Sequence, residues 1–543
     1  MASGYVRSPE LQRLADAVLQ PGFEGKSPPP WLLRRLEAGL GGVALFSRNV
    51  ESREQVAALT AVLRSTNPDV IVGIDEEAGD VTRLEARTGS SRPGNWALGV
   101  VDDPDLTSAV ARDVGRDLAE AGVTLNYAPD ADVNSNPDNP VIGVRSFGAD
   151  PDLVARHTAA WITGQQSAGV AACAKHFPGH GDTSADSHHL IPLITAGREE
   201  LERCELVPFR AAIAAGARAV MTGHLLVPAI DEDLPATLSR RVMTDLLRGE
   251  LGFTGLVVTD GIEMRALTGP YGLAGAAVRA LAAGVDAVCV GGDHADERTA
   301  TALRDAIVDA VVDGRLPEQR LVEAAGRVAE LAAWTARQRA DLDGHRPPRD
   351  AGLGLAAARR AIRLTAATGG QPLPLSAPPH VVELSPASNI AVGDDVPWGL
   401  RDLLADAMPD TTGVRLGEAD FLDGVDLHQV ALAPAGGRPL VVVVRDAHRY
   451  EWVVQALKVL VGARDDCVVV ETGLAGSAWG AVHVATWGGS LACRQAAAEL
   501  LVPPGAGPAA GETAASAAGV TAGSAASTTA GSAASTTGAG MPR

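Results

Sequence analysis

Short apolar segments alternate with longer amphipathic segments between about residue 40 and residue 340, and this alternation limits the possible folds more than any other feature of the sequence. The apolar segments read as strands buried on both faces, as in a parallel sheet covered by helices. The intervening segments, such as PDLVARHTAAWITGQQ, have the period of amphipathic helices. This pattern predicts a (β/α)8 TIM-type barrel, although only seven strand segments are evident: GGVALFS, VIVGID, VTLNYAPDADV, ACAKHFPG, AVMTGHLLV, GLVVTDG and DAVCVGG.

Polar residues end five successive strand segments of the predicted barrel. In such barrels the carboxyl ends of the strands meet on one face, and reactions take place there. We therefore expect these side chains to approach one another and to form an active site. They are Asp75, Asp130, Asp132, Lys175, His176, His224 and Asp260.

The remainder of the chain divides into three parts. Residues 1–340 are predicted to form the barrel domain, and residues 341–365, rich in Pro and Arg at their start, a linker. Strand-like segments such as HVVELSP and CVVVETG alternate with helical ones in residues 366–502, which predicts a smaller, sandwich-like α/β domain. Residues 503–543 consist mainly of Ala, Gly, Ser and Thr, have no apolar surface to bury, and are expected to be a disordered tail.

The composition excludes several classes of protein. With 46% hydrophobic residues the chain has ample material for large cores, and its net charge of -20 argues against nucleic acid or an anionic membrane as partner. The polar amino-terminal segment does not resemble a signal peptide, and we find no transmembrane segment. Five scattered cysteines without CxxC spacing favour a reducing compartment, so we expect a cytoplasmic protein.

The segment KHFPGHGDTSADSHH, residues 175–189, holds four of the twelve histidines and follows directly on a predicted strand. Asp186 and His188 are two residues apart, so the carboxylate can bind the imidazole, fix its tautomer and raise its basicity. This favours a general acid/base. Gly179 and Gly181 would let the backbone approach a ligand closely.

Metal binding is the main alternative for this segment. Its histidines and aspartates could supply a zinc or manganese site. However, the common two-histidine spacings do not occur, and Lys175 would place a positive charge beside the cation. The candidate ligands are His176, His180, Asp182, Asp186, His188 and His189.

Two further groups of residues carry reactive or ligand-binding side chains. Asp260 ends the strand of GLVVTDG, where a carboxylate could be a nucleophile, a base, a metal ligand or a helix cap. Asp75 ends another strand segment, and Arg83 follows it eight residues later. Arg83, and likewise Arg145 in NPVIGVRSFG, could be an ion-pair partner or a ligand contact. Together with Lys175 and His176 they would suit a neutral polyol bound by charge-assisted hydrogen bonds, which points to a sugar. The residues that would form these hydrogen bonds are Asp75, Arg145, Lys175 and His176.

The segments KHFPGHGDTSADSH, NPVIGVRSFG, VMTGH, PATLSRRVMTDLLRGELGFTGLVVTDGIEM and GIDEEAGDVTRL together resemble the family 3 glycoside hydrolases, in particular the β-N-acetylglucosaminidase branch of NagZ type. The likeness extends in order over about residues 10 to 340. It implies a retaining exo-β-N-acetylglucosaminidase that acts on cell-wall fragments such as muropeptides. The carboxy-terminal domain resembles, more weakly, that of two-domain members of Gram-positive type.

The resemblance also implies a role for each site residue. Asp260 would form the covalent glycosyl-enzyme, His188 would be the acid/base oriented by Asp186, and the terminal sugar would be bound by Asp75, Arg145, Lys175 and His176. No cofactor or metal is implied, the partner is a carbohydrate, and we expect a monomer. A phosphorylase using the same residues, a metal-dependent barrel hydrolase and a non-catalytic sugar-binding protein remain alternatives.

One residue departs from the family pattern. Ala78 stands where the family motif DEEGG has its first glycine. If the backbone there needs a positive φ, the extra methyl group costs on the order of 1 kcal/mol. Such strain could disturb the loop of Asp75 but removes no reactive group.

Overall fold

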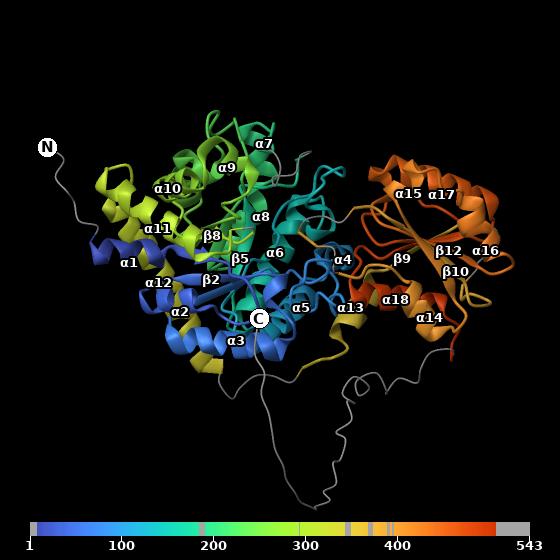
Figure 1. Cartoon of the computed structure of the whole chain (residues 1–543). Coiled ribbons are helices and arrows are strands. Elements are labelled where there is room, and N and C mark those ends of the chain that lie inside the picture. Colours follow the sequence, from blue (N-terminus) through green and yellow to red (C-terminus); the bar gives the residue numbers. More distant parts are fainter. Residues whose placement is uncertain are drawn as a thin grey trace, which may run out of the picture.

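The computed structural model describes residues 8–183, 191–292, 294–342, 349–367, 373–387, 391–393 and 396–505. It contains two α/β regions that lie side by side, the barrel coloured blue to yellow and the carboxy-terminal domain orange to red in Figure 1. Short strands and covering helices alternate in both regions. The predicted fold, a TIM-type barrel followed by a smaller α/β domain, is confirmed.

The barrel is built from eight short parallel strands. Six of them pair in chain order from β2 to β7, β1 pairs with β8, and a bridge between Val258 and Ala287 connects β7 to the start of β8. The strands are β1 (Leu19–Pro21), β2 (Gly42–Leu45), β3 (Ile71–Ile74), β4 (Leu125–Asn126), β5 (Ala171–Phe177), β6 (Ala219–Thr222), β7 (Leu256–Thr259) and β8 (Val288–Val290).

The strand that the sequence pattern does not reveal is β1. It has only three residues and ends in Pro21, which has no N–H for a ladder, so it gives no apolar run. The predicted strand VTLNYAPDADV was too long, because only Leu125–Asn126 pair as β4. A cis peptide bond between Ala128 and Pro129 follows in the same segment.

Helices cover the outside of the barrel. Several begin at a side chain that caps the first turn, since Ser8, Ser52, Asp103, Asp150 and Asp296 each accept a hydrogen bond from the backbone N–H three residues later. No helix in the described ranges is both long and apolar enough to cross a membrane. The helices are α1 (Pro9–Ala17), α2 (Pro30–Glu37), α3 (Arg53–Thr66), α4 (Asn95–Val101), α5 (Pro104–Glu120), α6 (Pro151–Gln166), α7 (Arg198–Arg203), α8 (Leu206–Ala214), η4 (Arg241–Glu250), α9 (Arg265–Tyr271), α10 (Leu273–Ala283), α11 (Glu297–Val312) and α12 (Glu318–Leu342).

Alternate residues of each barrel strand pack on opposite faces, as the period of two requires. In β5, Ala171 and Cys173 belong to the core inside the barrel, whereas Ala172 and Ala174 pack against the outer helices. Small inward residues keep the interior filled without crowding. For example, a side chain at Gly73 would overlap the hydroxyl of Tyr127, which enters the interior from β4's end.

The carboxy-terminal domain has a six-stranded sheet in the order β11-β10-β12-β13-β14-β9, parallel except for β9. The Val run of β12 packs on both faces: Val442 and Val444 contact the α17 side, and Val441 and Val443 the α14 and α18 side. Its elements are α13 (Leu353–Ala361), β9 (Arg363–Ala366), β10 (His380–Ser385), α14 (Arg401–Ala407), β11 (Thr412–Gly417), α15 (Glu418–Leu422), α16 (Ala433–Ala435), β12 (Leu440–Val444), α17 (Glu451–Ala463), β13 (Val468–Glu471), β14 (Val482–Ala485) and α18 (Leu491–Leu501).

The boundary between the regions is more structured than a linker. Residues 341–365, predicted as a linker, include α13 and the start of β9. Small side chains of α4, α13 and α18 form one core cluster, so the three helices pack closely where the barrel meets the second domain (Figure 1). The cluster consists of Ala97, Ala358, Ala361, Ala492, Cys493 and Ala496.

Candidate active site

Three of the predicted site residues enter the barrel mouth because they continue the inward-facing series of their strands. Inward residues lie two apart, so Ile71 of β3 leads to Asp75, Cys173 of β5 to Lys175, and Val258 of β7 to Asp260. Each side chain follows the last apolar residues on the inner face. The alternation that fills the core therefore also delivers the polar groups to one place.

These residues line one cavity of about 270 Å³ at the carboxyl ends of the strands. This volume lies just below the usual range for small-molecule sites. All the predicted sugar-binding residues and the predicted nucleophile border it. Residues in or directly after seven strands, β2 to β8, and one residue of the second domain, Ala391, contribute to its lining. The lining includes Phe46, Asp75, Glu77, Arg83, Tyr127, Arg145, Lys175, His176, His180, Met221, Asp260, Glu263 and Cys289.

A buried network of four charges forms one wall of the cavity. Lys175 Nζ lies 2.7 Å from Asp75 Oδ1 and 2.6 Å from Glu77 Oε1. Arg145 binds Glu77 with two parallel hydrogen bonds, Nε to Oε2 at 2.9 Å and Nη2 to Oε1 at 2.8 Å. Only Asp75 retains substantial exposure, with 23% of its side chain accessible, against 2% for Lys175. Two carboxylates and two cations thus compensate one another.

The charges of this network fix its protonation at neutral pH. Burial alone would raise the pKa of Glu77, but Arg145 and Lys175 outweigh it and hold that pKa well below its usual range. Burial likewise opposes the charged form of Lys175, and Asp75 and Glu77 reverse this effect and raise the pKa of Lys175. Both groups are therefore ionised over the physiological range, and Lys175 offers the cavity a cation, not a base.

His176 is oriented by a second buried group. Its Nδ1 lies 2.7 Å from Asp132 Oδ2, and its backbone N–H donates to Asp132 Oδ1 at 3.1 Å. Burial and Asp132 raise the pKa of Asp130, whereas His176 outweighs the effect of burial on Asp132 and keeps its pKa low. Asp132 is thus the ionised member, which places a proton on Nδ1 of His176 and leaves Nε2 as the nitrogen for a ligand.

The same residues are the candidate metal ligands within the described part of the chain. Donor atoms of Asp130, Asp132 and His176 all lie within 4.8 Å of one another. This set differs from the one that the sequence suggested, since His180 Nδ1 instead meets Thr183 Oγ1 at 2.7 Å. Because Nδ1 of His176 already bonds Asp132, we interpret the cluster as a hydrogen-bonded support for the imidazole.

The loop after β5 is anchored over its first half, contrary to the expectation that its glycines approach a ligand. Side chains at Gly179 and Gly181 would collide with Glu205 and with the backbone of Val133, so both glycines serve packing against the protein. The His180 N–H donates to Asp132 Oδ1 at 2.7 Å. Burial lowers the pKa of His180 to about 4, so its ring is neutral near pH 7.

Asp186 and His188, the predicted acid/base pair, lie outside the described residues, which end at residue 183 on this side of the loop. Their roles stay predictions. The described part of the loop ends three residues before Asp186, on a segment bound to Asn139, whose side-chain amide donates to the backbone oxygens of His180 at 2.8 Å and Gly181 at 3.0 Å.

Asp260 is held by the backbone around it. Its N–H donates to Thr222 O of β6 at 3.1 Å, and its Oδ1 accepts the N–H of Gly261 at 2.7 Å. His224 meets the carbonyl oxygen of Gly261 with Nε2 at 3.0 Å, which fixes the turn after the nucleophile candidate. His224, another predicted strand-end residue, therefore supports this turn.

Sequence reasoning missed Glu77 and left Asp132 without a role. Glu77 binds both cations of the site, and its only signal was its place in DEEAG, two residues after Asp75. Arg83, left open between an ion pair and a ligand contact, borders the cavity and donates from Nη2 to the carbonyl oxygen of Ala391 at 2.9 Å. These partners are distant in sequence, so spacing could not reveal them.

The family model for the glycosyl hydrolase family 3 N-terminal domain matches residues 35–331, which include most of the barrel and the residues that line this cavity. The chain belongs to glycosyl hydrolase family 3. Among family 3 members of known structure it is similar to a β-N-acetylglucosaminidase from Paenibacillus sp. str. FPU-7, with 32% identity and a TM-score of 0.78, over 91% of this chain and 97% of that one.

Curated relatives of the chain are β-hexosaminidases. A β-hexosaminidase from Nitrosomonas eutropha is 37% identical over 48% of this chain and 76% of its own length. Beta-hexosaminidase A from Pseudoalteromonas piscicida is 34% identical over 54% of this chain and 53% of its own length, so the match spans about half of that relative. The chain thus groups with the β-hexosaminidases of family 3.

Ala78, the departure from the family 3 motif, does occupy a left-handed conformation, with φ +61°. Glycine would remove a strain of about 1–2 kcal/mol there and lose about 0.8 kcal/mol of methyl burial. We therefore expect A78G to leave the free energy of unfolding unchanged or to raise it by up to about 1 kcal/mol in urea denaturation. The equally buried A111G in α5 is the control and should lose about 2 kcal/mol. An equal loss in the free energy of unfolding for A78G and A111G would show that Ala78 is not strained.

Proposed function

We propose that the chain is a retaining exo-β-N-acetylglucosaminidase that removes terminal N-acetylglucosamine from β-linked glycosides. The observation that carries this proposal is the common cavity of Asp260 and the buried network of Asp75, Glu77, Lys175 and Arg145. A strand-end carboxylate shares the cavity with fixed groups that can bind sugar hydroxyls. Family 3 membership and the similarity to β-hexosaminidases support the same activity.

In the first step, a carboxylate oxygen of Asp260 attacks the anomeric carbon while the bond to the glycosidic oxygen breaks. His188 donates a proton to the departing oxygen, and Asp186 stabilises and orients the imidazole. The terminal sugar remains bound to Asp260 as an ester. Asp75, Lys175, Arg145 and His176 hold its hydroxyls by charge-assisted hydrogen bonds throughout.

In the second step, neutral His188 takes a proton from water, which attacks the anomeric carbon and releases Asp260 with net retention of configuration. An imidazole in this role departs from the usual pair of carboxylates. It is uncharged when it acts as a base, so an incoming anion meets less repulsion than it would from a carboxylate. Phosphate could therefore compete with water as acceptor.

Cell-wall fragments such as muropeptides are the proposed substrates, on the strength of the family resemblance, and we propose that the chain acts as a monomer in the cytoplasm. All five cysteines lie in the described part of the chain and are free, which supports a reducing compartment. The net charge of -20 argues against a nucleic acid as partner.

The test is an assay of the full chain with 4-nitrophenyl N-acetyl-β-glucosaminide, with and without phosphate and with and without a chelator. We expect N-acetylglucosamine as the product in all four mixtures, identified by mass. N-acetylglucosamine 1-phosphate in the phosphate mixtures would identify a phosphorylase. Loss of turnover with chelator would identify a metal-dependent hydrolase, and binding of the sugar without turnover a binding protein.

A further inference from the structure

A two-residue turn connects the sugar-binding network to the second domain. Glu77 and Asp80 flank Ala78 and Gly79, whose φ angles of +61° and +59° are both positive. The N–H of Glu77 donates to Val81 O at 3.0 Å, so the segments on either side of the turn are bonded to each other. With only two residues between them, Glu77 and Asp80 cannot move independently.

Asp80 is bound by the second domain with both carboxylate oxygens. Oδ2 accepts from Arg445 Nη2 at 2.8 Å, and Oδ1 accepts the backbone N–H of Gly489 at 2.7 Å. Arg445 directly follows β12, and Gly489 lies between β14 and α18. The Asp80 side chain is only 2% exposed, so its charge depends on these partners.

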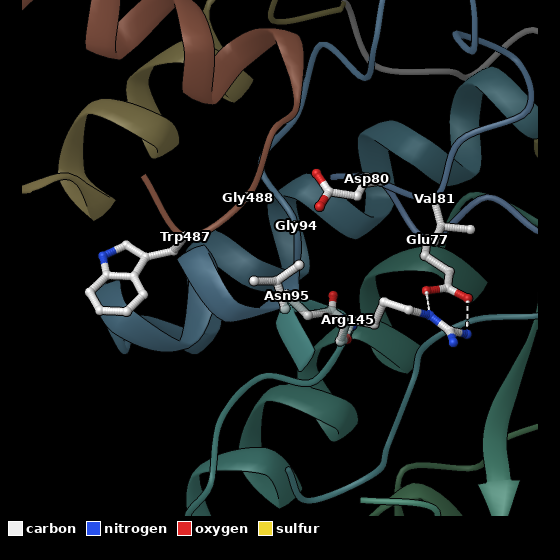
Figure 2. A pocket seen from close by; sticks show the side chains of 10 residues that line it. Glu77, Asp80, Val81, Gly94, Asn95, Arg145, Trp487 and Gly488 are labelled. Atoms are coloured by element: carbon white, nitrogen blue, oxygen red, sulfur yellow. Dashed lines mark hydrogen bonds and ion pairs between the residues drawn. The ribbon is translucent and has the colours of Figure 1, made fainter. Parts of the chain in front are cut away.

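The two carboxylates of the turn point to different sides. Figure 2 shows the Glu77 carboxylate meeting Arg145, while Asp80 is directed toward Gly488 of the second domain. The space between the turn and Trp487 is only about 10 Å³, about the size that a single water occupies. The turn therefore has little room to shift without moving Glu77 and its cations.

We propose that Asp80 and Arg445 are positioning residues through which the second domain holds Glu77, and with it Arg145 and Lys175, in the sugar-binding arrangement. The turn needs such support because Ala78 occupies a conformation that L-residues disfavour. The part of Arg145 and Lys175 in sugar binding rests on the proposed function. Asp260 has backbone anchors of its own, Thr222 of β6 and Gly261, and none of these contacts involves this turn.

The experiment compares the full chain with D80N, which keeps the size of the side chain and removes its charge. We expect KM for the aryl N-acetyl-β-glucosaminide to rise about tenfold and kcat to change less than about threefold. R445M should raise KM by a similar factor, and R445K should raise it less than R445M does. The KM of the double variant D80N/R445M should be no higher than that of either single variant, because both substitutions remove the same contact.

The matched control is R360M, which breaks another ion pair between the two regions, Arg360 to Asp103 at 2.8 Å, without touching the turn. Its KM should equal that of the unchanged chain. A D80N enzyme with unchanged KM and a lower kcat or active fraction would overturn the proposal, because it would show a purely structural contact. If D80N does not fold, the KM of R445K is compared with the KM of R360M and of the unchanged chain instead.

A second readout does not depend on the reaction. Amide hydrogen exchange in a peptide covering residues 76–84 should be faster in D80N than in R360M, because the turn loses its anchor. Equal exchange in the two variants would also overturn the proposal. An unchanged chain that fails to turn over the aryl glycoside would refute the proposed function alone, since the exchange comparison still decides whether the second domain holds the turn.

Discussion

D260A is expected to abolish turnover of an aryl N-acetyl-β-glucosaminide, with a loss in kcat on the order of 10⁴-fold or more. In the proposed first step this carboxylate supplies the bonding electron pair, and the two carboxylates of the buried network already bind cations. Asp75 binds Lys175, and Glu77 binds both cations. Steady-state kinetics and the melting temperature of the variant give the measurement.

Azide provides a sharper version of this experiment. In D260A the removed side chain leaves space beside the anomeric carbon, where azide can attack and produce a glycosyl azide of inverted configuration. This product would assign Asp260 as the nucleophile, not a base. D245A, at an exposed position of η4, is the control and should retain full activity. A folded D260A enzyme within tenfold of normal rates would refute the assignment.

H188A is expected to lose about 10²–10⁴-fold in kcat/KM on a substrate with a poor leaving group, such as an alkyl glycoside or a disaccharide. On a 2,4-dinitrophenyl glycoside the loss should be less than about tenfold, because that leaving group departs without a proton. We compare kcat/KM because it reports the steps up to the glycosyl-enzyme and is independent of its hydrolysis.

The neighbouring histidine is a matched control for this prediction. H189A removes an identical side chain one position later, and we expect its kcat/KM to remain near normal for both leaving groups. Equal losses of H188A on both substrates would argue for a structural role. A large selective loss in H189A would move the acid/base to that residue.

The strand ends show how far the site could be predicted. Asp75, Lys175 and Asp260 follow inward-facing core residues with a period of two, so their meeting at the barrel mouth is inherent in the pattern of each strand. His176 deviates from this period. The pairing of β5 with β6 shifts register between Ala174 and Phe177, which lets two consecutive residues border one cavity.

Other parts could not be predicted from local patterns. Strand β1 is too short to give a local pattern and ends in proline. It forms because it pairs with β8, which is its neighbour in space although almost the whole barrel sequence separates the two strands. The helix α13 in the expected linker is stabilised by packing on α4 and α18. Glu77 attracts notice only when Arg145 and Lys175 are seen to share it. Each of these features arises from residues far apart in the chain.

The sequence by itself determined the barrel, the smaller α/β domain and the set of reactive side chains at strand ends, because hydrophobic period and strand-end polarity are local properties. Only the tertiary structure decided which charges compensate one another and that Ala78 has a left-handed backbone conformation. It alone also shows that the second domain binds this turn through Asp80. Such contacts depend on where distant segments meet, and the energy of a buried charge is set by its neighbours in space.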